Sequence, residues 1–258
     1  MNAVTKITSA QNENYKFWRE LKSAKAIRDS NSFFLMGEKL IHEFLKISER
    51  NDVTARFTIL SEVYPEDSHP LTNGSVKKFS LTPSLFKELD VVGTHFNLLL
   101  IKFSDFRKVD LNEKPKGLEV VAPLGDPGNM GALIRSALAF NVKKMILTKE
   151  SCHPFHPRAL KASAGASLHM NFSYSEESFA SLATSRDDHF LDRGGKNIFK
   201  FQWPANLRLW IGEEGPGISK ISAKNSERIL SIPTVGVESL NATVAASLAI
   251  SEWARNQK

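Results

Sequence analysis

The sequence is poor in cysteine and in long apolar runs. Cys152 is its single cysteine among 258 residues, so no disulfide can form within the chain, and a reducing compartment is expected. Residues 1–17 have no apolar core of signal-peptide length. The apolar run at 96–101 is far too short to cross a bilayer. We therefore expect a cytoplasmic protein.

Several signature motifs of nucleotide-binding and hydrolytic enzymes are also missing. The sequence has no G-x-G-x-x-G turn and no phosphate-binding Gly-Lys-Ser/Thr loop, and it lacks G-x-S-x-G and H-E-x-x-H. The cysteine and histidines of 152–156 lack a second ligand pair, so no metal site is expected. These absences argue against hydrolases, zinc peptidases and a nicotinamide-dependent oxidoreductase, which is the rival enzyme class.

Basic residues outnumber acidic ones, and they gather near the beginning of the chain. The net charge is +6 and the sequence pI is about 9.3. Residues 1–28 carry six basic groups against two acidic ones. Such a surplus predicts a surface that contacts phosphates, although a solvated helix face gives the same pattern.

Apolar periodicity predicts an α/β protein with two domains, because helical and strand patterns alternate along the chain. In the first part we expect helices and strands at 12–26, 33–47, 56–63, 76–82, 83–92 and 95–103. In the second part we expect them at 117–123, 129–140, 142–148, 157–166, 168–174, 175–185, 207–212, 227–233 and 240–256. The segment 207–212 is interpreted as a fully apolar strand of a buried parallel sheet. Polar residues between the two parts predict a domain at 1–104, a linker at 105–116 and a second domain at 117–258.

The first chemistry-bearing segment, 124–140, is a strand end, a turn and a helix. Asp126-Pro127-Gly128 has the composition of a turn, and Asn129 is the predicted N-cap of the helix. Arg135 lies off the apolar stripe, one turn above Gly131, and should project toward the loop mouth. An arginine there suits a phosphate or another anion, although a surface arginine of an amphipathic helix would look the same.

Two further segments also break from apolar strands into glycine-containing loops. The loop at 212–217 has three glycines, which allow a close backbone approach to a ligand. Its Glu213 and Glu214 would repel a pyrophosphate and tolerate a cationic or polyhydroxylated ligand better. The segment 232–250 turns at Gly236 and then opens a helix rich in small residues, with Ser239 or Asn241 as the predicted N-cap. A plain strand-to-helix connection remains the alternative for each loop.

Together and in this order, the three segments resemble the SPOUT class of RNA methyltransferases, in particular its SpoU (TrmH-like) branch. The first motif, N-x-G-x-x-x-R, matches Asn129, Gly131 and Arg135. The other two motifs match Gly212, Glu214, Gly215 and Gly217, and then Ile232, Pro233, Gly236, Ser239, Leu240 and Asn241. The resemblance covers 117–258, and the part before it is similar to an L30e-like substrate-binding domain.

This resemblance implies an α/β trefoil-knot domain that binds S-adenosyl-L-methionine and forms a homodimer. Gly212, Ile232 and Leu240 would line the cofactor site, mainly through backbone atoms. The acceptor nucleotide would be held by Arg135, Asn129, Glu214, Ser239 and Asn241. The implied reaction is ribose 2′-O-methylation of RNA, ribosomal RNA before transfer RNA. A knotted RNA-binding protein without catalysis is the non-enzyme alternative.

Overall fold

Two structural units are described here from a computed structural model, which covers residues 4–213, 218 and 226–257. Unit 1 comprises residues 1–105 and 155–165, and unit 2 comprises residues 106–154 and 166–258. Within the described residues, no helix has the length and apolar character needed to span a membrane.

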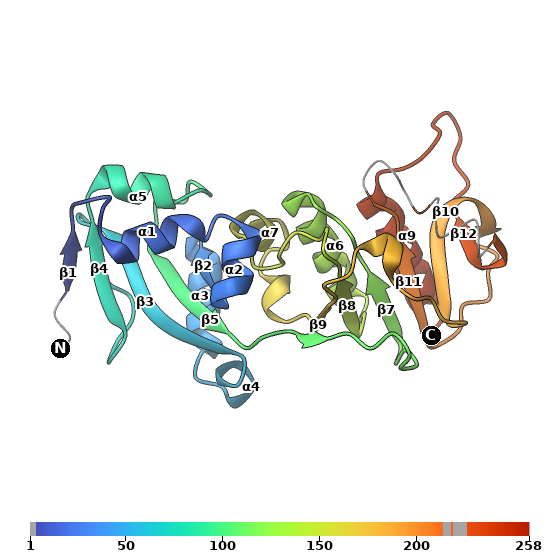
Figure 1. The fold of residues 1–258 in the computed structure, drawn as a ribbon, viewed down its shortest axis with the longest axis horizontal. Coiled ribbons are helices and arrows are strands. Elements are labelled where there is room, and N and C mark those ends of the chain that lie inside the picture. Colours follow the sequence, from blue (N-terminus) through green and yellow to red (C-terminus); the bar gives the residue numbers. More distant parts are fainter. Residues whose placement is uncertain (1–3, 214–217, 219–225, 258) are drawn as a thin grey trace. The chain divides into compact units, whose positions relative to one another are not determined.

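Unit 1 contains a mixed sheet with the strand order β1-β4-β3-β5-β2 (Figure 1). Strand β3 pairs in parallel with β4, whereas β5 is antiparallel to both β3 and β2. Its strands are β1 (Thr5–Ile7), β2 (Ser32–Met36), β3 (Phe57–Pro65), β4 (Lys77–Leu81) and β5 (Leu98–Phe103). Its helices are α1 (Glu13–Glu20), α2 (Ala24–Ser30), α3 (Glu38–Ile47), α4 (Asn51–Thr54), α5 (Pro83–Leu89) and α7 (Pro157–Ala162).

A short segment from the second half of the sequence, residues 155–165, packs within unit 1. The ring of Phe155 stacks on Phe33 with 4.6 Å between centroids and meets Phe57 and Phe103 edge to face. Phe155 is buried, and aromatic pairs of this kind add to the free energy gained from burial alone. The aromatic core of unit 1 is therefore completed by a residue more than fifty positions after β5.

Unit 2 is built on a seven-stranded parallel sheet with the order β12-β10-β11-β7-β8-β9-β6. The strands are β6 (Arg107–Lys108), β7 (Leu118–Val121), β8 (Lys144–Leu147), β9 (Phe172–Tyr174), β10 (Asp188–Asn197), β11 (Leu207–Ile211) and β12 (Ile229–Ser231). Among its described residues, the α-helices are α6 (Pro127–Ala139) and α9 (Ala242–Arg255), and the 3-10 turns are η1 (Ala166–Leu168), η2 (Phe179–Ser181) and η3 (Ser226–Arg228). The predicted α/β class with a parallel sheet is confirmed.

A buried ionic cluster joins four strands of this sheet near their amino-terminal ends. Arg208 on β11 is 0% exposed and forms ion pairs with Glu119 on β7 at 3.1 Å and Asp188 on β10 at 3.2 Å. Lys144 on β8 contacts the other oxygen of Glu119 at 2.9 Å. The prediction of a fully apolar strand at 207–212 is therefore wrong at Arg208, whose charge is neutralised inside the sheet rather than exposed.

The Arg208 guanidinium also binds the polar segment that precedes β7. It donates to the carbonyl oxygens of Leu111 and Glu113 at 3.2 and 3.0 Å. The Leu111 side chain packs with Val109 against the apolar core of unit 2. These residues of the predicted linker are thus part of the packed structure of unit 2.

Several elements differ from the sequence-based expectations, and the short elements β1, β6 and α4 were not predicted. The helix expected at 12–26 is two helices, because Ser23 caps α2 by accepting from the Ala26 N–H. The helix expected at 175–185 is only the short turn η2, where Phe179 and Leu182 pack into the core. Strand β10 was not predicted. At Gly195 its backbone lies very close to β12, and a Cβ atom added to this glycine would be only 2.4 Å from the Ile229 carbonyl oxygen.

Candidate active site

The three glycine-containing segments all follow strands of the parallel sheet in unit 2. The first follows β7 and the second follows β11, and these two strands are neighbours. The chain passes from β7 to β8 and β9 on one side and returns through β10 and β11 on the other. Ligands of open α/β sheets bind at such a switch point, beyond the carboxyl ends of the strands. The third segment follows β12, which lies two positions from β11 in the same sheet.

The first segment forms α6, but its cap differs from the prediction. Asp126 is the N-cap, and its carboxylate accepts a hydrogen bond from the Asn129 N–H at 2.8 Å. Pro127 occupies the first helical turn, where its missing N–H costs nothing. The prediction of Asn129 as N-cap is therefore wrong, because Asp-Pro starts the helix three residues earlier. The Asn129 side chain therefore does not cap α6.

Asn129 and Asn241, which are far apart in the sequence, lie together at the beginnings of α6 and α9. The Asn241 amide Nδ2 lies 3.4 Å from Asn129 Oδ1. Asn241 Oδ1 caps α9 by accepting from the N–H groups of Thr243 and Val244, so the predicted cap at Asn241 is confirmed. Thr243 Oγ1 donates to the Asn129 carbonyl at 3.2 Å, a contact that sequence reasoning missed.

Helices α6 and α9 also pack against one another beyond this junction. The hydroxyls of Ser136 and Ser247 lie 2.9 Å apart, and Ser247 also donates to the Thr243 carbonyl. Ala246 and Ala249 on α9 are buried. Small side chains therefore let the two helix axes approach, as the small-residue pattern of 240–250 indicated.

Arg135 stands apart from the asparagine pair. Its side chain is exposed on α6, while Met130, Leu133 and Ile134 of the same helix are buried. Within the described residues, no hydrogen bond or ion pair holds its guanidinium, which is therefore available to an external anion. The structure thus brings Asn129 and Asn241 together but does not join Arg135 to them.

The loop between β12 and α9 carries the remaining predicted residues of the third motif. Gly236 has φ of +81°, a conformation that favours glycine, and Thr234 Oγ1 donates to the Val237 carbonyl across the turn. Arg193 on β10 forms an ion pair with Glu238 of this loop. Ser239 is exposed, and Ile232 and Leu240 are half-buried.

The candidate cofactor residues contribute backbone rather than side-chain chemistry. Gly212 is half-buried directly after β11. In the part of the chain that the structure describes, the backbone groups of Ile232 and Leu240 take part in no hydrogen bond. The predicted residues Glu214, Gly215 and Gly217 lie outside the described residues.

Glu150, just beyond the carboxyl end of β8, is a charged residue that the sequence did not single out. Burial favours its neutral form, but hydrogen bonds from Thr148 Oγ1 at 2.6 Å and the Phe179 N–H at 3.0 Å outweigh it. With its own N–H and nearby Lys149, they lower the pKa of Glu150 below the usual value for glutamate. An ionised carboxylate therefore lies at the carboxyl edge of the sheet.

Replacing Asn241 by alanine tests the junction of α6 and α9. The variant loses the cap of α9 and the amide that faces Asn129, so we expect the free energy of unfolding to fall by about 1 kcal/mol. Asn241→Asp keeps the cap and should be close to wild type in stability while lacking the donor to Asn129. Urea denaturation of both variants measures the difference, and equal stability of Asn241→Ala and wild type would contradict the capping role.

Comparison with known proteins agrees with this geometry. The model of the SpoU rRNA Methylase family matches residues 119–251. A ribosomal RNA small subunit methyltransferase G 2 of Syntrophobacter fumaroxidans is 37% identical over 253 residues, which is 97% of this chain and 49% of that protein. The chain thus spans about half the length of that relative. A 23S rRNA (guanosine(2553)-2′-O)-methyltransferase of Bacillus subtilis is 23% identical, over 95% of this chain and 97% of that one.

Solved structures share the fold along nearly the whole chain. An AdoMet-bound rRNA methyltransferase from Sinorhizobium meliloti has a TM-score of 0.76 at 19% identity and covers 99% of both chains. The SpoU methyltransferase AviRb from Streptomyces viridochromogenes, in complex with AdoMet, has a TM-score of 0.76 at 18% identity, over 96% of this chain and 98% of that one. Because the family model matches more than half of the sequence, over the segments that build the candidate site, the chain belongs to the SpoU rRNA methylase family.

Proposed function

We propose that this protein transfers a methyl group from S-adenosyl-L-methionine to a ribose 2′-hydroxyl of RNA, with ribosomal RNA as the first candidate. The main observation in its support is the contact between Asn241 Nδ2 and Asn129 Oδ1 at 3.4 Å. Residues from the first and third motifs, 112 positions apart, come together beside the carboxyl edge of the sheet. The names of the relatives support RNA as the substrate, since both describe ribosomal RNA methyltransferases.

The residues of this edge suit S-adenosyl-L-methionine. The uncommitted backbone groups of Ile232 and Leu240 offer donors and acceptors for an adenine and a ribose. The ionised carboxylate of Glu150 suits a site for a cationic ligand. Gly212, Ile232 and Leu240 would hold the cofactor, which supplies an electrophilic methyl group when it is bound. A nicotinamide dinucleotide fits less well, because the G-x-G-x-x-G turn is absent from the sequence.

The amino-acid side chains would prepare the ribose hydroxyl for attack. Arg135 binds the phosphate next to the target nucleotide and, through its positive charge, stabilises the developing alkoxide. Arginine stays protonated in proteins and is disfavoured as the proton-abstracting base, so the hydroxyl proton would pass to solvent water. Asn129 and Asn241, with Ser239 and Glu214, would orient the acceptor nucleotide.

A homodimer explains why Arg135 lies apart from the asparagine pair. Exposed apolar side chains occur on both packed helices, at Leu138 on α6 and at Val244 and Leu248 on α9. Covering these side chains with a second copy would remove apolar surface from water. In the proposed dimer the partner's copy of α6 helps to complete each active site.

The predicted knot and domain roles belong to the same proposal. Threading of the carboxy-terminal segment is supported by the packing of α9 on α6, the helix that follows the central strand β7. The predicted RNA-binding domain at 1–104, linker at 105–116 and methyltransferase domain at 117–258 are proposed as a division of roles in a cytoplasmic protein, whereas by packing residues 106–116 belong to unit 2 and residues 155–165 to unit 1. Transfer RNA is the alternative substrate. A catalytically silent RNA-binding protein is disfavoured by the exposed, uncommitted Arg135.

Isothermal titration calorimetry with two ligands separates the proposed cofactor from its rival. We expect the protein to bind S-adenosylhomocysteine with a dissociation constant in the micromolar range and to give no heat with NADH. Binding of NADH without S-adenosylhomocysteine would contradict the proposal.

A further inference from the structure

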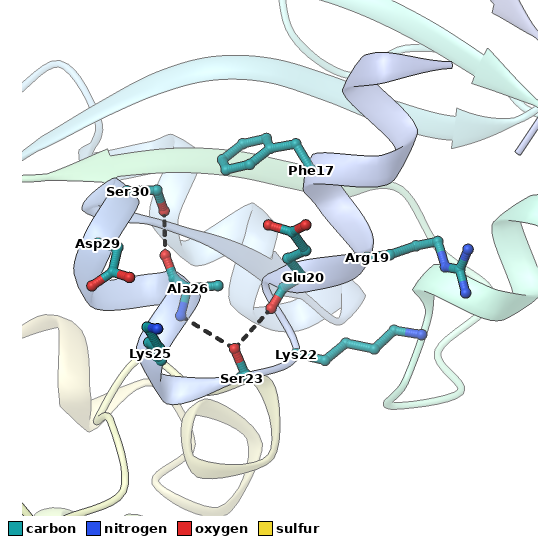
Figure 2. Close-up of a pocket in the computed structure, with 9 residues that line it drawn as sticks. All are labelled: Phe17, Arg19, Glu20, Lys22, Ser23, Lys25, Ala26, Asp29 and Ser30. Carbon is teal, nitrogen blue, oxygen red and sulfur yellow. Dashed lines mark hydrogen bonds between the residues drawn. The ribbon is translucent and has the colours of Figure 1, made fainter. Parts of the chain in front are cut away.

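A pocket of about 670 Å³ opens in unit 1 between α1 and α2 (Figure 2). This volume lies within the range of roughly 300–1,000 Å³ that is usual for small-ligand sites. The pocket wall combines an aromatic ring, two carboxylates and three cationic side chains, namely Phe17, Glu20, Asp29, Arg19, Lys22 and Lys25. Such a wall suits a ligand that has a planar ring, hydrogen-bond donors and adjacent negative charge.

Hydrogen bonds hold the two helices that form the pocket in a fixed arrangement. Ser23 Oγ accepts from the Ala26 N–H at 3.2 Å and donates to the Glu20 carbonyl at 3.1 Å, so one hydroxyl joins both helices (Figure 2). The Tyr15 hydroxyl donates to Glu88 Oε2 at 2.7 Å and thereby anchors α1 to α5. A wall fixed in this way loses little conformational entropy when a ligand binds.

The charged side chains of the pocket are exposed, apart from the half-buried Lys22, and they differ in their partners. Arg19 pairs with Glu88 at 2.8 Å, and Lys22 donates to the Glu88 carbonyl at 2.7 Å. Both extend away from Asp29 (Figure 2). By contrast, Glu20, Lys25 and Asp29 have no ion-pair partner within 4 Å among the described residues of this chain. The two carboxylates are therefore free to accept hydrogen bonds from a ligand.

Helical spacing places the unpaired charged groups on shared faces of their helices. Phe17 and Glu20 are three residues apart on α1, and Lys25 and Asp29 are four residues apart on α2, so each pair shares one helix face. The ring of Phe17 is half-buried, which leaves part of its surface open to the pocket. An aromatic surface beside basic groups is the arrangement that proteins use for single-stranded nucleic acids.

We propose that this pocket binds one unstacked base of the RNA, with guanine preferred. This inference rests on the proposed RNA substrate. Phe17 provides the stacking surface. A carboxylate of Glu20 or Asp29 accepts the N1–H and N2–H donors of guanine together, whereas uracil would turn carbonyl oxygens toward the same negative charge. Lys25, with Arg19 and Lys22, contacts the flanking phosphates.

Fluorescence anisotropy of the full-length protein with two labelled pentaribonucleotides tests the base preference. The oligonucleotide UUGUU should bind at least about fivefold more tightly than UUUUU, because a bidentate contact discriminates by that factor or more. Glu20→Gln and Asp29→Asn should reduce this ratio. Glu13→Gln, which changes an exposed acid on the same helix outside the pocket, is the matched control and should preserve it.

Variants of Phe17 test the stacking surface. Phe17→Leu keeps an apolar side chain without aromatic faces and should weaken binding of both oligonucleotides about tenfold. Phe17→Trp should retain binding. Thermal unfolding of both variants verifies that unit 1 is folded. Lys25→Gln should reduce the slope of log affinity against log salt concentration by about 0.7, as expected for one phosphate contact to a single strand.

Equal affinity of the wild-type protein for the two oligonucleotides would overturn the proposal. Wild-type behaviour of folded Phe17→Leu together with an unchanged ratio in Glu20→Gln and Asp29→Asn would also overturn it. These binding measurements need no cofactor. If the wild-type protein methylates RNA but the pocket variants bind both oligonucleotides normally, the proposed role of the pocket is wrong and the proposed function stands. If the wild-type protein methylates no RNA, the proposed function itself is wrong.

Discussion

Replacing Arg135 by alanine is expected to lower the rate of RNA methylation by about a hundredfold or more. This magnitude is typical for the loss of one group that stabilises charge in a transition state. Affinity for S-adenosylhomocysteine should stay within a few fold of wild type, because the proposed cofactor contacts come from the loops after β11 and β12. Single-turnover kinetics with labelled cofactor and calorimetry measure the two quantities separately.

Two further variants separate the role of Arg135 from a general effect of charge. Arg135→Lys keeps the positive charge but loses the planar fork that binds two phosphate oxygens, so its activity should lie between those of wild type and Arg135→Ala. Arg255→Ala removes another exposed arginine, which pairs only with Glu252 on α9 among the described residues, and should leave the rate unchanged. Near-normal turnover of Arg135→Ala would refute the assigned role.

Replacing Arg208 by methionine is expected to destabilise unit 2 by about 3–5 kcal/mol. The variant leaves the carboxylates of Glu119 and Asp188 buried without their common cation, and an uncompensated buried charge is costly. It also removes the donors to the Leu111 and Glu113 carbonyls. Three of the four tryptophans, Trp203, Trp210 and Trp253, belong to unit 2, so urea denaturation followed by tryptophan fluorescence reports mainly on this unit.

A compensating variant distinguishes charge burial from lost packing. Arg208→Met combined with Glu119→Gln and Asp188→Asn removes the stranded charges, and it should recover a substantial part of the lost stability. Lys144→Met is the milder control, since Lys144 is partly exposed and Glu119 keeps Arg208 as a partner. If Arg208→Met alone unfolded at the wild-type urea concentration, the buried cluster would not stabilise unit 2.

The sequence predicted those parts of the fold that local pattern controls. Strands β7 and β5 are rich in apolar residues, with one charged residue each, Glu119 and Lys102, and they were located within a few residues. Arg208 was missed because alternation and apolarity do not show which distant carboxylates will neutralise a charge inside a sheet. The expected helix at 175–185 failed because the three-residue spacing of Phe179 and Leu182 is satisfied by a single 3-10 turn.

Sequence patterns indicated the loops of the candidate site but not the contacts between them. Glycine-containing loops after apolar strands indicated where the chain reaches the edge of the sheet, and Gly236 with its positive φ is such a position. The contact between Asn129 and Asn241 depends on how α6 and α9 pack, which no local pattern encodes. The proline after Asp126 is a signal for a helix N-cap at Asp126. This signal was missed because Asp-Pro-Gly was interpreted as a turn.

Methyl transfer to RNA, followed by location of the methyl group, tests the central claim most directly. The protein is incubated with labelled S-adenosyl-L-methionine and total RNA from cells that lack this gene, and the RNA is then digested to nucleosides. We predict label in a 2′-O-methylated nucleoside with the wild-type protein and almost none with Arg135→Ala. Label on a base, or no incorporation into any RNA by folded wild-type protein, would contradict the account.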